Sequence, residues 1–171
     1  MDREELIRRF KSGERDFRRV DFNGVRLASL DLTGIILVEA NLSRCKLVDT
    51  IFHNANLEGA CFEGANLDGA DFQNTNLCRA NFNNSILIRA TFDTCKADEV
   101  SFKGADIRMA DFNNVTLRRT IWTNISFGEN LFVDTDFTGT KGIFDIWHDA
   151  VRVTMPDGEI CTNPRLEKLD L

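Results

Sequence analysis

Histidine is scarce in this chain of 171 residues, which contains only His53 and His148. These two lie 95 residues apart, and neither has histidine, cysteine or carboxylate partners at the spacing of known metal sites. The sequence also lacks the glycine-rich phosphate loops and the nucleophile elbow that mark common classes of enzyme. We therefore expect no catalytic residue, no metal and no cofactor, and we interpret the protein as non-enzymatic.

Cysteine is present without any pairing pattern. The five positions are Cys45, Cys61, Cys78, Cys95 and Cys161. No two of them have the Cys-x-x-Cys spacing of a zinc site, and their odd number does not suggest a disulfide framework. We expect free thiols, with Cys45 and Cys95 buried as small hydrophobic residues.

An excess of basic charge and a long apolar run are both missing. The net charge is −6 and the pI is about 5.0, whereas nucleic-acid-binding proteins normally carry a basic stripe that neutralises phosphates. No apolar run approaches the length of about 18 residues that a membrane span requires. The first ten residues are mostly charged and lack the apolar segment of a signal peptide. These absences predict a cytoplasmic protein that contacts neither nucleic acid nor membrane directly.

What the sequence does contain is a large apolar residue at every fifth position. The series runs from Phe17 to Phe137 through 25 positions, with ten Leu, twelve Phe and single Ala, Ile and Trp residues. A period of five would spiral around every face of an α-helix, because five residues advance it by about 500°. In a flat strand the same period would alternate between the two faces. The chain must therefore turn a corner every five residues, which predicts an all-β solenoid with these residues inside.

The sizes of these central residues indicate the number of sides in one coil. Between positions 57 and 117 Leu and Phe alternate, except that Ala97 and Ile107 replace two Leu residues, so the pattern repeats every ten residues. The number of sides must then be even. Two sides could not enclose side chains, and six would leave a hollow that native packing density disfavours. Four sides remain, so residues twenty apart stack, with Phe on two opposed walls and Leu on the other two.

The residues around each centre follow a second pattern. Alanine often lies two residues before the centre and Asp or Asn lies one before it, as in Ala55-Asn-Leu and Ala70-Asp-Phe. These stretches resemble the pentapeptide-repeat family, whose motif reads A(D/N)LXX. The resemblance covers about 125 residues and implies a right-handed quadrilateral parallel β-helix of about six coils. It also implies that many members, notably cyanobacterial ones, have no assigned biochemical function.

The ends of such a solenoid need covers, because terminal coils otherwise expose core and strand edges. We divide the single domain into a helical N-terminal cap at 1–14, the β-helix at 15–139 and a C-terminal cap and tail at 140–171. Asp2 and Gly13 suit the start and the end of the first helix. In the tail, the apolar residues between 143 and 151 suit a short helix, and Pro156-Asp157-Gly158 suits the turn of a hairpin.

One of the four predicted walls is strongly acidic. Its outward charges are five aspartates, with no lysine or arginine: Asp31, Asp71, Asp93, Asp111 and Asp134. We call this side of the solenoid the acidic wall. The sequence thus favours a scaffold that binds another protein, of basic character and unidentified, through this wall. An inert structural module is the plainer alternative, and the oligomeric state is not indicated.

Mimicry of duplex DNA is an alternative function. Some family members, the quinolone-resistance and mycobacterial gyrase-binding proteins, resemble duplex DNA, so the chain could be a DNA mimic that binds a topoisomerase or another nucleic-acid-binding protein. Five aspartates over roughly 25 Å weigh against mimicry, because a duplex presents about 15 phosphates over that length.

A secondary apolar patch consists of Ile86, Ile88 and Met109 on a Leu wall, although scattered apolar surface is normal.

Overall fold

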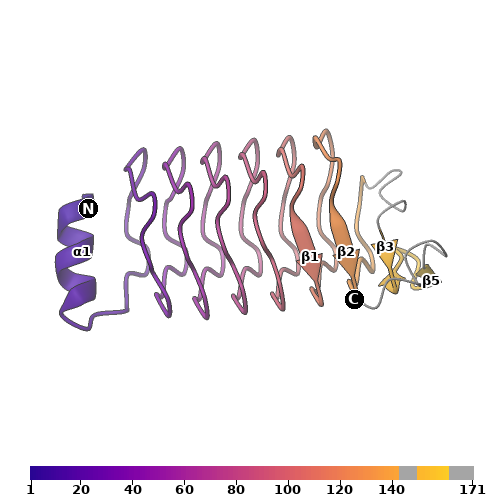
Figure 1. Cartoon of the computed structure of the whole chain (residues 1–171), viewed down its shortest axis with the longest axis horizontal. Coiled ribbons are helices and arrows are strands. Elements are labelled where there is room, and N and C mark those ends of the chain that lie inside the picture. Colours follow the sequence, from indigo (N-terminus) through magenta and orange to yellow (C-terminus); the bar gives the residue numbers. More distant parts are fainter. Residues whose placement is uncertain (143–149, 162–171) are drawn as a thin grey trace.

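The computed structural model describes residues 1–142 and 150–161, which wind into a row of stacked laps (Figure 1). Helix α1 (Arg3–Lys11) lies across one end of the row. Two short strands, β1 (Asp111–Asn113) and β2 (Leu131–Val133), form part of the laps, and β3 (Ala150–Val151) pairs with β2. Beyond β3, a hairpin is formed by β4 (Val153–Thr154) and β5 (Ile160–Cys161).

Each lap contains twenty residues. Parallel bridges join residues twenty apart in an unbroken register, from the pair Asp16 and Ile36 to the pair Ile121 and Lys141. The same offset pairs β1 with β2, where Asp111 lies beside Leu131. Since the apolar centres recur every five residues, a lap of twenty has four sides. The stacking predicted from the period is confirmed over this range.

The corners between sides depend on a residue two places after each centre. This residue has a positive φ, about 71° at Gly24 but also about 57° at Arg19 and Glu39. The left-handed conformation suits glycine best, so the other residues are held there by the surrounding ladder. Many corners are also tied by the Asp or Asn before the centre, as where the Asn23 N–H donates to Asp21 Oδ1 at 2.9 Å.

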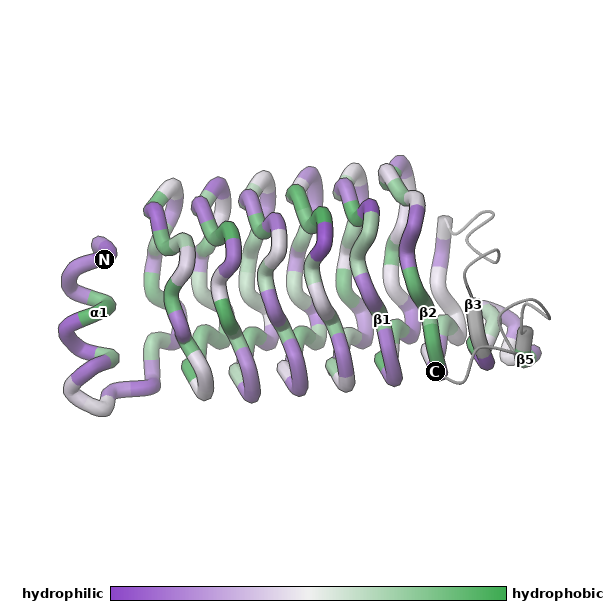
Figure 2. Tube along the Cα trace, viewed as in Figure 1, coloured by the Kyte–Doolittle hydropathy of each residue, from purple (hydrophilic) through white to green (hydrophobic). Residues whose placement is uncertain are grey.

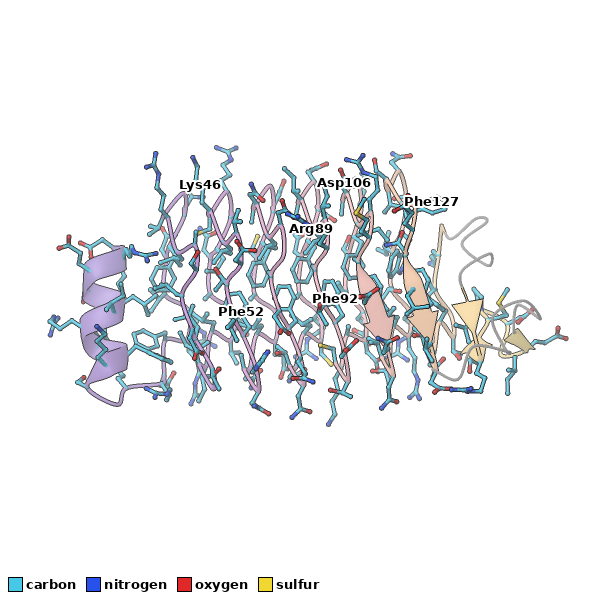
Figure 3. The ribbon with its side chains drawn as sticks, in the orientation of Figure 1. Lys46, Phe52, Arg89, Phe92, Asp106 and Phe127 are labelled. Atoms are coloured by element: carbon cyan, nitrogen blue, oxygen red, sulfur yellow. The ribbon has the colours of Figure 1, made fainter. Side chains whose placement is uncertain are left out.

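The interior is built from stacked aromatic rings. Phe92 lies parallel to Phe112, one lap on, with ring centroids 4.6 Å apart. Across the interior it meets Phe102 edge to face at 6.1 Å. Both arrangements are favourable for aromatic pairs. Figure 3 shows Phe52 and Phe92 inside the laps, and Figure 2 shows hydrophobic and hydrophilic residues alternating along the chain. The predicted Phe walls are thus present.

The small inward residues contribute hydrogen bonds as well as volume. Thr75 Oγ1 donates to the carbonyl of Phe52 at 2.6 Å, and Thr135 Oγ1 donates to that of Phe112 at 2.7 Å. Cys95 is buried, as predicted, and its Sγ lies 2.8 Å from the Phe72 carbonyl. The polar atoms at these positions therefore have partners although they face the core.

Four cysteines are free thiols, as expected from their spacing: Cys45, Cys61, Cys78 and Cys95. Burial raises the pKa of Cys45 to about 11 and that of Cys95 to about 12. Cys161 lies in β5, and its side chain lies outside the described part of the structure.

Phe127 departs from the predicted register. It occupies a central position, yet it is 42% exposed. The buried Asn130 side chain points inward instead, where Nδ2 donates to the carbonyls of Ile107 and Ala110 and Oδ1 accepts from the Gly128 N–H at 2.8 Å. The prediction that every centre lies inside is therefore wrong at this position.

The bulk of Trp122 gives a physical reason for this exception. Trp122 takes the place of a Phe in its column, and its ring lies 5.6 Å from Phe112, 6.4 Å from Phe132 and 5.8 Å from Phe137. Its indole N–H donates to Thr120 Oγ1 at 2.6 Å. Because the interior is close-packed, one more aromatic ring would overfill this lap.

Helix α1 satisfies part of the N-terminal edge of the ladder. Its Leu6 side chain is fully buried. The Met1 ammonium group donates to the Asp21 carbonyl at 2.9 Å, and Arg3 Nη1 donates to the carbonyls of Arg26 and Ala28 at 3.2 and 3.1 Å. These carbonyls have no earlier lap to pair with, so Arg3 of α1 and Met1 just before it supply donors that such a lap would have provided.

The last described lap is two residues shorter than the others. Phe132 pairs with Ala150 and Asp136 with Thr154, both eighteen residues on. The helix predicted near 143–151 is wrong at residues 150 and 151, which form strand β3, while residues 143–149 lie outside the described part. Strand β3 pairs with the backbone N–H and C=O groups at the edge of β2, which a helix would leave unpaired. The predicted turn at 156–158 does connect two paired strands, β4 and β5.

Candidate interaction surface

Three aspartates of the acidic wall lie on one straight column. The bridges run from Asp31 through Ile51 to Asp71, and from there through Thr91 to Asp111. Adjacent strands lie about 4.8 Å apart, so successive carboxyl groups are roughly 10 Å apart along the wall. The structure thus brings these three predicted residues together on one face.

The first two carboxylates of this column are fixed by their own corners. Asp31 Oδ1 accepts from the Thr33 hydroxyl at 2.6 Å and from the Thr33 N–H at 3.0 Å, and these bonds lower the pKa of Asp31. Asp71 Oδ1 accepts from the Gln73 N–H at 3.0 Å. Both aspartates therefore serve the fold as hydrogen-bond acceptors at their corners.

His53 lies beside the column, which the sequence pattern did not reveal. Its Nε2 is 2.7 Å from Asp71 Oδ2. This nitrogen is shielded from solvent and has no hydrogen-bond partner among the described residues, so the two side chains are in contact without a hydrogen bond. The imidazole ring therefore lies against the acidic wall at Asp71.

Negative charge is most crowded around Asp111. Burial raises the pKa of Asp111, and the neighbouring charge of Asp93 raises it further. Asp93 Oδ1 accepts a hydrogen bond from Asn113 Nδ2 at 2.8 Å. This bond joins Asp93 to the next lap and fixes the position of its carboxylate. A cation placed here would relieve the repulsion, so this is the part of the wall with most to gain from a basic partner.

Asp134 does not present an unpaired charge. Arg152 Nε lies 2.6 Å from Asp134 Oδ1 and Nη2 lies 2.8 Å from Oδ2. This ion pair lowers the pKa of Asp134. The sequence analysis assigned no arginine to the repeats of this wall, but the short last lap places Arg152 of the tail against Asp134. This arginine offsets one of the five aspartate charges.

The secondary apolar patch is partly exposed. Ile86 and Met109 are 40% and 47% exposed, while Ile88 is half-buried. Phe127 adds to the same wall, and the sequence missed it because its register placed it inside. Figure 3 shows Phe127 and Asp106 along one edge of the molecule. The patch is interrupted by charge, because Arg108 Nη2 lies 2.6 Å from Asp106 Oδ2.

Within the described ranges, no group of three or more His, Cys, Asp or Glu residues is arranged to hold a metal ion. No helix in this part of the chain has the length and apolar character needed to cross a membrane.

Sequence comparison identifies the repeat. The family profile described as Pentapeptide repeats, with eight copies of the repeat, matches residues 26–64, 35–74, 65–104 and 75–114, which together span more than half of the chain. The chain belongs to the pentapeptide repeat family. Pentapeptide repeat proteins fold as right-handed quadrilateral β-helices, and the parallel ladder of twenty-residue laps fits that architecture.

Several solved structures are similar to this pentapeptide repeat protein. HetL from the cyanobacterium Nostoc sp. strain PCC 7120, involved in heterocyst differentiation regulation, is 20% identical, with 94% of this chain and 99% of that chain covered and a TM-score of 0.40. A pentapeptide repeat protein from the Arabidopsis thaliana thylakoid lumen is 24% identical, with coverages of 81% and 85% and a TM-score of 0.49. The full-length fluoroquinolone resistance protein QnrB1 is 17% identical, with coverages of 81% and 80% and a TM-score of 0.34. A comparison with curated proteins found no significant match.

Proposed function

We propose that this pentapeptide repeat protein is a non-enzymatic scaffold that binds a basic segment of another protein through the acidic wall. The crowding of negative charge at Asp111 and Asp93 carries the proposal, since a positively charged partner would stabilise both carboxylates. The rigid ladder adds to this, because it fixes Asp31, Asp71 and Asp111 at regular intervals before any partner arrives.

The test removes charge without disturbing the corners. In the double variant Asp71→Asn and Asp111→Asn, the amide oxygen at position 71 can still accept the Gln73 N–H. The matched control is Asp16→Asn with Asp21→Asn, which removes two aspartates at the equivalent position of two other walls. Wild-type protein and both variants are immobilised, and partners retained from the native host are quantified by mass spectrometry.

We expect the acidic-wall variant to lose at least fivefold in the retention of a partner that the control variant still binds. Retention of the wild type should also fall steeply with salt, because exposed charges are screened. Equal retention of a partner by all three proteins would exclude the acidic wall as its binding surface, and retention of no partner by any of them would favour the inert-module alternative.

The DNA-mimic alternative has its own test, which is gyrase supercoiling in the presence of micromolar protein. The ion pair between Asp134 and Arg152 lowers the charge that a DNA-binding enzyme would meet on this wall. We therefore expect supercoiling to be unaffected.

The finer architecture forms part of the same proposal. We place about six coils at 15–139 in a cytoplasmic protein, with 1–14 as a helical cap and 140–171 as a C-terminal cap and tail. The donors that Met1 and Arg3 supply to the first lap support a capping role for α1.

A further inference from the structure

The N-terminal edge of the acidic wall has backbone groups without partners. In the second lap, the Ile51 N–H donates to the Leu30 carbonyl at 2.9 Å and the Ile51 carbonyl accepts from the Leu32 N–H at 2.8 Å. Asp31 occupies the same place in the first lap. Neither its N–H nor its carbonyl has a backbone partner within the described residues, and the Thr33 carbonyl has none either. Such an edge is a template for another strand.

Helix α1 covers other edges and leaves this one open. Met1, just before the helix, donates to the carbonyl of Asp21 on one wall, and Arg3 of α1 donates to those of Arg26 and Ala28 on the next. The helix passes the edge at Asp31 without supplying a donor from any described residue. An extended chain could therefore still enter between the helix and this edge.

A groove of about 320 Å³ lies at this place. Ile7 and Phe10 of α1 line one side, and Leu30 and Leu32 of the first lap line the other. Phe10 is held in position by Arg15, whose guanidinium lies 3.9 Å from the ring centroid and donates to the Phe10 carbonyl at 2.9 Å. The groove is large enough for a bulky apolar side chain and is already formed in the absence of a partner.

The charge at the groove favours an acidic ligand. Lys11 lines the groove, is exposed, and makes no ion pair with any described residue. The other charged group, Asp31, already accepts two hydrogen bonds from Thr33. A carboxylate of the ligand would therefore find an available ammonium group beside the apolar groove.

From this geometry we infer that the groove binds an extended segment of a partner protein, which adds a parallel strand to the Asp31 edge. The segment's backbone N–H groups donate to the Asp31 and Thr33 carbonyls, and one of its carbonyls accepts from the Asp31 N–H. One large apolar side chain fills the space between Phe10 and Leu30, and an adjacent carboxylate pairs with Lys11. Strand addition of this kind gains affinity from the main chain and specificity from the side-chain pocket.

The test selects a ligand without assuming its sequence. A fully randomised octapeptide library is displayed and selected on the immobilised full-length protein. The expected result is an enriched motif with one large apolar residue next to Asp or Glu. The absence of an enriched motif that joins a large apolar residue to Asp or Glu would overturn the proposal, whatever basic motifs the acidic wall itself selects.

Variants then locate the bound peptide. Lys11→Glu should weaken the selected peptide at least fivefold in fluorescence anisotropy. Arg8→Glu, the same charge change at another exposed position of α1, should leave its affinity within twofold. The same peptide with alternate amides N-methylated should bind at least tenfold more weakly, because strand pairing needs those N–H groups. Equal affinity of the peptide for both charge variants would contradict the proposed site. So would equal affinity of the methylated and unmethylated peptides for the wild type.

A second copy of the chain is the other conceivable occupant. Light scattering of the wild type and of Lys11→Glu distinguishes it from a peptide partner. A dimer that Lys11→Glu dissociates would assign the groove to self-association and overturn the inference, whereas a monomer in both cases agrees with it.

Discussion

Arg152 lies against Asp134, with Nε 2.6 Å from Oδ1 and Nη2 2.8 Å from Oδ2. The two residues are eighteen apart, whereas the repeat would place residue 154 at this level. Two residues removed from the last lap thus bring a cation to the end of the acidic wall.

Replacing Arg152 by Gln should raise the pKa of Asp134 towards its ordinary value, because the hydrogen bond from Arg152 is the main cause of the lowered pKa. A lowered pKa stabilises the fold above the pKa of the unfolded chain, and this stability is lost as the pH falls through the folded value. The pair is exposed, so the loss at neutral pH should be only ~0–1 kcal/mol. NMR titration of the Asp134 carboxyl carbon measures the shift. Arg108→Gln serves as the control, and an unchanged titration in Arg152→Gln would contradict the pairing.

Two phenylalanines at equivalent repeat positions should differ in their contribution to stability. Phe92 is fully buried between stacked rings, so Phe92→Ala should cost about 3–5 kcal/mol. Phe127 is 42% exposed, so Phe127→Ala should cost less than ~1.5 kcal/mol. Urea unfolding of the two variants measures the difference. Equal losses would mean that Phe127 lies inside after all.

The buried thiols should resist alkylation in the folded protein. The thiolate is the reactive form, and burial raises the pKa of Cys45 to about 11 and that of Cys95 to about 12, so little thiolate exists at neutral pH. Cys61 faces outward and is half-buried, which makes it the internal control. Mass spectrometry of protein treated with iodoacetamide, native and denatured, gives the modification at each site. Rapid labelling of native Cys95 would show that the interior opens.

Removing the side chain of Arg3 should loosen the first lap. Arg3→Ala leaves the carbonyls of Arg26 and Ala28 without their donor, at a cost of about 1–2 kcal/mol for bonds from a charged group at a partly exposed site. Arg8→Ala, on the exposed side of the same helix, should cost much less. Urea unfolding measures stability, and hydrogen exchange should show faster exchange in α1 and the first lap. No difference between the two variants would argue against the capping role of Arg3.

Most of the fold followed from the period of five. The central residues, the lap of twenty and the column of Asp31, Asp71 and Asp111 all depend on one repeating geometry, which a single sequence displays many times. The contacts that escaped prediction occur where the geometry is not repeated. Phe127 is displaced next to Trp122, the only Trp at a central position, and Asn130, the only Asn two places before a centre. Arg152 reaches Asp134 only because the last lap is short.

The corners illustrate a second limit of the sequence. Glycine two places after a centre marks a left-handed residue, as at Gly24, and the sequence shows this clearly. Arg19 and Glu39 adopt the same conformation, although their side chains give no such signal. The neighbouring laps impose it, so the tertiary structure overrides the local preference.

The four sides have the same number of residues, so the number of residues between two positions determines which sides of the solenoid they face. Deleting one five-residue unit between Asp71 and Asp111 would return every later Leu or Phe to the interior, yet it would turn all later surface residues by one side. Asp111 would then point a quarter-turn away from Asp71. Removing twenty residues would keep both facing the same way and only shorten the molecule. In this architecture each deletion of five residues rotates the later surface residues by a quarter-turn and leaves the central residues in the interior.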